Sequence, residues 1–127
     1  MSLIDDLQIR DVVYGDKVVT AKMYLNDFHA QPYGYVNGGA TIAFGEVLAG
    51  MATYHMGGGD YAGVGQTVTA HHISPRKPEG YVIAKGVLLH GGKRSHTWDI
   101  SVYDETEKVL ISKITVVNAL VPLKVEK

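Results

Sequence analysis

One segment of this chain, residues 38–55 with the sequence GGATIAFGEVLAGMATYH, constrains the fold more than any other. Its composition predicts a helix that is apolar on every side, and such a helix is normally buried. The helix carries a carboxylate in its middle, Glu46, and glutamate is almost never fully buried without a partner. Glu46 is therefore either a functional acid that finds hydrogen-bond donors or a residue on a solvated edge of the helix.

The segments on either side of this helix have the composition of β-strands. Two short β-branched runs, at residues 8–14 and 17–25, are separated by Gly15-Asp16, a pair typical of a hairpin turn. Four longer strand-like segments separated by turn residues follow the helix, at residues 64–74, 80–91, 95–104 and 109–120. This order predicts an α+β fold in which the helix packs on one face of an antiparallel sheet. The length suits a single domain, residues 1–127.

The overall composition excludes several classes of protein. No apolar run reaches the roughly 18–20 residues that span a bilayer, and the acidic start MSLIDDLQIRD lacks the features of a signal peptide. There is no cysteine, so the chain has no disulfide, thiol nucleophile or cysteine-based zinc site. The net charge of −1 argues against a dedicated nucleic-acid binder. We expect a protein of the cytoplasm with neither nucleic acid nor membrane as its partner.

Basic residues gather in the second half of the chain. Residues 71–98 hold five of the twelve basic residues against one acid, Glu79; the five are Arg76, Lys77, Lys85, Lys93 and Arg94. Such a local positive region suits a phosphorylated small ligand. The alternative is a chance cluster on solvated loops and strand ends.

The histidines do not form a metal-binding pattern. His71 and His72 are neighbours on a predicted strand and point to opposite faces, so they cannot chelate one ion together. His90 and His96 can approach across a hairpin, but the sequence offers no third ligand. We predict no metal site, and we expect Trp98 to belong to the core or to an interface.

A single helix covers only part of a six-stranded sheet. The uncovered remainder and the apolar character of the helix suggest burial against a second subunit. We therefore expect a homodimer or a larger even assembly, such as a homotetramer formed from two dimers.

Residues 31–53, QPYGYVNGGATIAFGEVLAGMAT, resemble the signature of hotdog-fold acyl-CoA thioesterases of the phenylacetate-degradation (PaaI-like) type. They are especially similar to the branch with the 4-hydroxybenzoyl-CoA and dihydroxynaphthoyl-CoA thioesterases. That signature runs Gln-Pro-aromatic-Gly, two residues, His-Gly-Gly, then an acid nine positions after the His. The matching residues are Gln31, Pro32, Tyr33, Gly34, Gly38, Gly39 and Glu46. The resemblance covers residues 36–121 and implies a hotdog domain, a long antiparallel sheet wrapped around one central helix.

The resemblance also implies a reaction, the hydrolysis of an acyl-CoA to a free acid and CoA without a cofactor. The thioester carbonyl would accept a hydrogen bond from the backbone N–H of Gly38 at the helix N-terminus. Gln31 would contact or orient the same carbonyl. Glu46, contributed by the opposite subunit, would act as a general base or as a nucleophile, and the sequence leaves both roles open.

Two residues depart from the family pattern. Asn37 stands where the family has its His; asparagine can cap the helix and donate a hydrogen bond but cannot titrate near neutral pH. Gly50 stands one turn after Glu46, where many relatives carry Ser or Thr. The remaining substrate-binding residues that the resemblance implies are Gly39, Gly50, His90, Lys93, Arg94 and Ser95. Of these, Lys93, Arg94 and Ser95 would lie near the nucleotide phosphates, although such residues are as often solvated loop residues.

Two alternatives come from other functional classes. Hotdog hydratases carry a Gly-Asp-x-Asn-Pro-x-His or His-Phe-Pro string, and neither occurs in this sequence. A non-catalytic acyl-CoA-binding hotdog module is the stronger alternative, because Asn37 and Gly50 can mark lost catalysis. Retention of both Gln31 and Glu46 argues for the enzyme.

Overall fold

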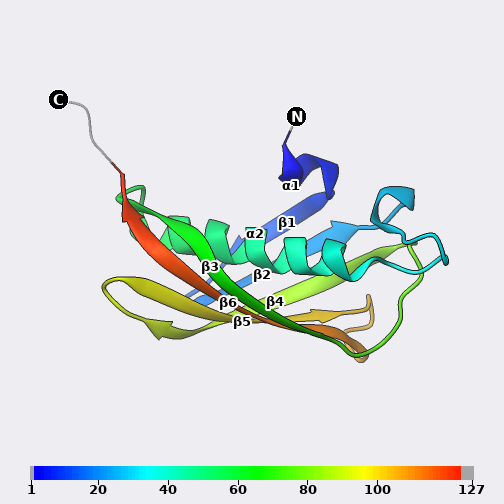
Figure 1. Ribbon diagram of the computed structural model, residues 1–127. Coiled ribbons are helices and arrows are strands. Elements are labelled where there is room, and N and C mark those ends of the chain that lie inside the picture. The colour runs from blue at the N-terminus through cyan, green and yellow to red at the C-terminus, as the bar shows by residue number, and fades with distance from the viewer. Residues whose placement is uncertain (1, 124–127) are drawn as a thin grey trace.

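The computed structural model describes residues 2–123 and has the predicted order of two strands, one long helix and four strands (Figure 1). The elements in chain order are α1 (Leu3–Asp6), β1 (Ile9–Tyr14), β2 (Val18–Tyr24), the 3-10 helix η1 (Asp27–His29), α2 (Gly38–Gly57), β3 (Tyr61–His72), β4 (Tyr81–Gly91), β5 (Ser95–Tyr103) and β6 (Leu110–Pro122). The strands form one antiparallel sheet in the order β1-β2-β4-β5-β6-β3. The predicted α+β fold, with a long sheet around one main helix, is confirmed.

The sequence did not predict α1 and η1. Each is a single helical turn, held by a side chain at its start: Ser2 accepts a hydrogen bond from the backbone of α1, and Asn26 does so for η1. Elements this short show no hydrophobic period that a sequence could reveal. The long helix α2 runs two residues past its predicted end and stops where Gly58 adopts the left-handed conformation, with φ of 59°.

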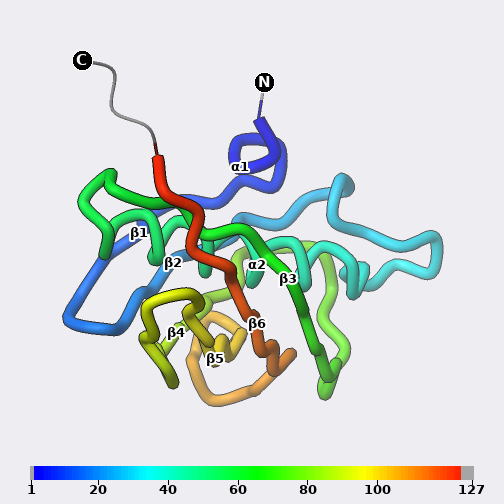
Figure 2. The backbone as a smooth tube through the Cα atoms, turned by 60° about the vertical axis from the view of Figure 1, so that its left-hand side comes forward, coloured from blue at the N-terminus to red at the C-terminus, as the bar shows by residue number. Residues whose placement is uncertain are grey.

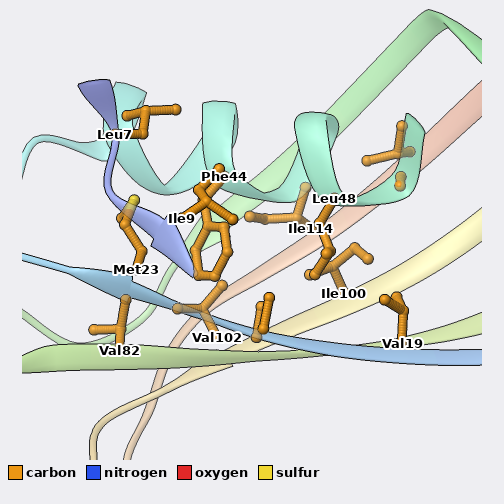
Figure 3. Packing of buried hydrophobic residues seen from close by; sticks show 14 of the residues in the cluster. Leu7, Ile9, Val19, Met23, Phe44, Leu48, Val82, Ile100, Val102 and Ile114 are labelled. Carbon is orange, nitrogen blue, oxygen red and sulfur yellow. The ribbon is translucent and has the colours of Figure 1, made fainter. Parts of the chain in front are cut away.

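The core lies between one face of α2 and the concave face of the sheet. Phe44 and Leu48 are fully buried and point from the helix toward sheet residues such as Ile100 (Figure 3). Trp98 is 1% exposed, so its predicted place in the core is confirmed. Its indole N–H donates to Thr53 of α2 over 2.9 Å, which satisfies the one polar group that this side chain buries.

The opposite face of α2 is not covered in a single chain. Glu46 is exposed, and so are two large apolar side chains near the end of the helix, Tyr54 and Met56. The expectation that an all-round apolar helix is buried on every side therefore fails for one copy of the chain. Among residues 2–123, no helix is long and apolar enough to cross a membrane.

The strand next to this uncovered helix face forms an edge of the sheet. β3 is 12 residues long, pairs only with β6, and runs alongside α2 (Figure 2). Most of its second half is exposed. A long bare edge offers unpaired backbone groups to another strand, and proteins rarely leave such an edge unprotected.

Candidate active site

A pocket of about 350 Å³ opens at the N-terminus of α2. It is built from the loop before the helix, the first turn of the helix, the end of β3 with the residues after it, and the start of β6. Its lining residues are Gln31, Tyr35, Val36, Gly38, Thr41, His72, Ile73, Ser74, Pro75, Arg76 and Ser112. Two of the predicted site residues, Gln31 and Gly38, thus meet in one pocket although seven positions separate them in the sequence.

The first residue of α2, Gly38, lines this pocket and has a backbone N–H without an acceptor in the helix. Asn37 is the N-cap, as predicted, and its side-chain oxygen accepts from the N–H of Gly39 over 2.9 Å. The N–H of Gly39, another predicted substrate-binding residue, is thus used by the cap. The N–H of Gly38 has no acceptor within the helix, because it belongs to the first turn. It therefore remains available at the positive end of the helix dipole.

The loop before the helix holds Gln31 at the pocket. The backbone of Gln31 donates to Tyr35 over 2.8 Å and accepts from Gly34 over 3.1 Å, so residues 31–35 form a tight turn. Gly34 has a φ of 87°, a conformation in which glycine is favoured. The side-chain amide of Gln31 makes no hydrogen bond within residues 2–123, which leaves it free for a ligand.

Three polar side chains that the sequence did not single out as site residues complete the pocket. Nδ1 of His72 lies 3.0 Å from the hydroxyl of Ser112 and 3.5 Å from that of Thr41. The hydroxyl of Thr41 donates to the carbonyl of Gly38 over 3.0 Å. The His72 ring lies directly against Gly38: a Cβ at that glycine would come within 2.6 Å of Nε2. The pairing of β3 with β6 and the packing of α2 against them bring these residues together, so no local sequence pattern could reveal them.

Glu46 does not reach this pocket within one chain. It follows Gly38 by eight residues, which corresponds to about 12 Å along the helix axis. Its carboxylate lies against Gly65 of β3, where a Cβ would collide with it. It makes no hydrogen bond or ion pair with the part of the chain that the structure describes. Gly50 lies one turn further along, beside Gly63 of the same strand.

The predicted CoA-binding residues of the β4–β5 hairpin lie at the other end of the molecule. The hairpin stands beside the end of α2 in Figure 1, and a helix of 20 residues is about 30 Å long. Lys93 lines a separate pocket there with Asp60 and Tyr61. A single chain therefore does not bring this hairpin to Gly38; the hairpin residues concerned are His90, Lys93, Arg94 and Ser95.

The basic region of residues 71–98 is less positive than its composition suggests. Arg76 forms an ion pair with Glu105, with Nη2 and Oε2 2.8 Å apart, and this guanidinium lowers the pKa of Glu105 to about 2. Lys85 forms an ion pair with Glu107. Both partners, Glu105 and Glu107, lie in the turn between β5 and β6, so a charge count over residues 71–98 does not include them. Two of the five basic residues thus have a carboxylate partner.

His96 belongs to a buried network and not to the pocket. It is 3% exposed, and its Nδ1 lies 3.0 Å from the hydroxyl of Thr53. Burial lowers the pKa of His96, and the neighbouring His90 lowers it further. Within residues 2–123, no group of three or more histidine, aspartate or glutamate residues is arranged to hold a metal ion.

Comparison with known proteins agrees with this fold. A family model described as the thioesterase superfamily matches residues 33–111. The chain is 30% identical over 111 residues to the 1,4-dihydroxy-2-naphthoyl-CoA hydrolase of Escherichia coli, covering 87% of this chain and 81% of that protein.

Two solved structures are also similar along nearly the whole chain. One is yhdA from Lactococcus lactis, described only as a candidate thioesterase, with a TM-score of 0.93, 52% identity, and coverage of 97% of this chain and 100% of that one. The other is a variant of a thioesterase from Pseudomonas aeruginosa, with a TM-score of 0.88, 32% identity, and coverage of 96% and 87%. These matches confirm the resemblance seen in the sequence: the chain belongs to the thioesterase superfamily, a family of thioester hydrolases with the hotdog fold.

Proposed function

We propose that the protein is an acyl-CoA thioesterase that hydrolyses its substrate to a free acid and CoA. The observation that carries this proposal is that Gly38, whose backbone N–H has no acceptor within the helix, lines the same pocket as Gln31. A backbone donor at a helix N-terminus stabilises the negative charge that develops on a carbonyl oxygen. The side-chain amide of Gln31 gives that oxygen a second donor or orients the carbonyl.

The carboxylate that acts in the reaction, as nucleophile or as general base, is that of Glu46 from a second copy of the chain. Glu46 lies against Gly65 of β3, and Gly38 lies against His72 of the same strand. If two β3 edges pair antiparallel about a two-fold axis at Thr69, and Gln66 is skipped there as it is opposite β6, Gly65 of one copy stands opposite His72 of the other. Neighbouring strands are about 4.8 Å apart. Glu46 of one copy would then approach the pocket at Gly38 of the other.

The bulge in β3 fits this register. Gln66 is skipped where β3 pairs with β6, so Gly65 and His72 both face the helix although their spacing is odd. Residues directly opposite each other in a sheet share a face. The same two-fold axis would run the two α2 helices antiparallel, and it would bring the β4–β5 hairpin of one copy toward the pocket of the other. The hairpin residues Lys93, Arg94 and Ser95 can then meet the CoA phosphates in the dimer.

The relative from Escherichia coli is named for an aromatic acyl-CoA, and Tyr35 brings an aromatic side chain to the pocket of this chain. We therefore propose an acyl-CoA substrate and take an aromatic acyl group as the first candidate. A cytoplasmic location fits such a substrate and a chain without cysteine.

The test is the release of free thiol from a panel of short, medium, branched and aromatic acyl-CoA thioesters. Wild type should hydrolyse at least one of them, and Glu46→Ala should lower kcat by about 10²–10⁴-fold, the contribution of a positioned acid–base group. Glu79→Ala removes another exposed glutamate and should leave the rate unchanged.

Asn37 and Gly50 favour a second candidate, an acyl-CoA-binding module without catalysis. A wild type that turns over no thioester in the panel but binds one tightly in calorimetry would support the module and contradict the enzyme. Full turnover by Glu46→Ala, with its fold intact by circular dichroism, would remove Glu46 from the mechanism.

A further inference from the structure

We propose that His72 is the base that takes a proton from the attacking water, in the subunit that holds the acyl carbonyl. This inference rests on the proposed thioesterase function. It starts from the position of the ring: His72 lines the same pocket as Gln31 and Gly38, and its Nε2 is the ring atom nearest to Gly38. An acyl carbonyl bound to the N–H of Gly38 would therefore lie within reach of Nε2.

The fold holds the ring in this position from both sides. The register of β3 and β6 pairs His72 with Ser112, and both side chains point toward the first turn of α2. Ser112 is 1% exposed, so its hydroxyl must find its hydrogen bonds inside the protein. Gly38 has no side chain, so the His72 ring can lie directly against its backbone. His71, one position earlier, pairs with Lys113 on the other face of the sheet.

The hydrogen bonds around His72 select one tautomer. The single proton of the Thr41 hydroxyl is donated to the carbonyl of Gly38. Ser112 donates its own proton to Thr41 over 3.4 Å, so the oxygen of Ser112 is left to accept from Nδ1 of His72 over 3.0 Å. This assignment makes these three hydrogen bonds and leaves the longer contact of 3.5 Å between Thr41 and Nδ1 unused. Nδ1 therefore carries the ring proton, and Nε2, which lies against Gly38, keeps its lone pair.

An imidazole with one nitrogen held by a hydroxyl and the other nitrogen free is the arrangement of a general base. The pocket lining contains no aspartate or glutamate. Apart from His72, its titratable side chains are those of Tyr35 and Arg76, and Arg76 forms an ion pair with Glu105. Among the residues that line the pocket of one copy, His72 is the one whose side chain has an uncharged nitrogen able to accept a proton from water.

With His72 as the base, two protein groups share the reaction: Glu46 attacks the acyl carbon, and His72 transfers the proton. The carboxylate of Glu46 from the second copy attacks the acyl carbon, the C–S bond breaks, and its electron pair leaves on the sulfur of CoA. Nε2 of His72 then takes a proton from water while the water oxygen bonds to the acyl carbon, and the bond to Glu46 breaks to return its carboxylate. The imidazolium gives its proton to the thiolate. The products are the free acid and CoA, and both side chains regain their initial state.

The inference is tested with His72→Ala and chemical rescue on the thioester that wild type turns over best. Loss of the base should slow turnover by about 10²–10⁴-fold. An initial burst of one thiol per site should survive, and the mass of the protein should rise by one acyl group. Added imidazole fills the space left by the ring and should restore turnover saturably, after subtraction of the rate without enzyme. His71→Ala is the matched control and should behave as wild type.

Two further measurements separate a base from a structural residue. Ser112→Ala should retain the fold but lose part of the activity, and imidazole should not restore it, because the ring itself remains. The ¹⁵N shifts of His72 in the wild type should show a proton on Nδ1 at a pH where the ring is neutral. Full activity of His72→Ala, a slow variant that imidazole does not rescue, or a proton on Nε2 would each overturn the inference and leave the thioesterase function standing. A wild type inert toward every thioester would overturn both.

Discussion

Glu46 and Gly38 lie on the same helix, yet about 12 Å of helix axis separates them, and the Glu46 carboxylate is exposed beside the free edge of the sheet. A carboxylate at that distance cannot act on a carbonyl held by the N–H of Gly38 in the same chain. The chemistry that we propose for these two residues therefore requires two copies. The first two predictions below follow from this separation.

Two inactive variants should restore each other when their subunits exchange. In a mixed dimer of Gln31→Ala and Glu46→Ala, one site carries both defects and the other carries neither. Random pairing makes half of the dimers mixed, so activity should recover to at most about a quarter of that of wild type. Thiol release before and after exchange measures this recovery. If subunits labelled with different isotopes are seen to mix but no activity returns, the two residues do not come from different copies.

The proposed register of β3 can be tested because the chain contains no cysteine. Thr69 is exposed and would face itself across the two-fold axis. Cβ atoms of directly opposed residues are about 4.5–5.5 Å apart, so Thr69→Cys should form a disulfide-linked dimer under mild oxidation. Thr106→Cys, in the turn between β5 and β6, is the control and should stay monomeric on a non-reducing gel. Equal cross-linking of both variants would rule out this register.

Asn37 should matter for stability through its cap. Asn37→Ala removes the acceptor for the N–H of Gly39 and should lower the free energy of unfolding by about 1 kcal/mol, measured by urea denaturation. It should also slow hydrolysis, because the N–H of Gly38 loses its fixed direction. Asn37→His restores the residue that the family pattern has and should remain active. A loss of activity in Asn37→His as large as in Asn37→Ala would mean that the cap is not what the site needs.

The buried His96 should make stability fall as the pH is lowered. The Thr53 hydroxyl accepts from Trp98 over 2.9 Å and from Asn118 over 3.3 Å, so its own proton is donated to Nδ1 of neutral His96. Burial, together with the nearby His90, lowers the pKa of His96 in the folded state below its ordinary value of 6.5. The unfolded chain therefore binds a proton first, and the contribution present above pH 6.5 is lost as the pH falls below it.

Urea denaturation of wild type and of His96→Gln at several pH values between 5 and 7.5 measures this contribution. The variant should be less stable than wild type at pH 7.5 and should lose less stability on acidification. His71→Gln, which changes an exposed histidine, should keep the pH dependence of wild type. An identical pH dependence in wild type and His96→Gln would show that His96 does not cause it.

Local patterns in the sequence were sufficient for the order of elements and for part of the site. Two β-branched runs located the first two strands, and the alternation of apolar and polar residues located the four that follow the helix. The Gly38-Gly39 pair after Asn37 located the start of the helix to the residue. These signals are local, because side-chain spacing and helix capping depend on neighbours a few positions away. Trp98 was assigned to the core or to an interface from its residue type alone.

Only the tertiary structure decided which residues share the pocket. His72 and Ser112 are 40 positions apart and meet through the register of β3 with β6, while Thr41 joins them from the helix. The same strand pairing leaves the edge of β3 and the carboxylate of Glu46 exposed, and it places the β4–β5 hairpin far from Gly38. Such contacts depend on long-range strand register, which alternation along a single strand does not specify. The sequence by itself thus determined the elements and the chemical type of several site residues, and the packing of the sheet determined their partners.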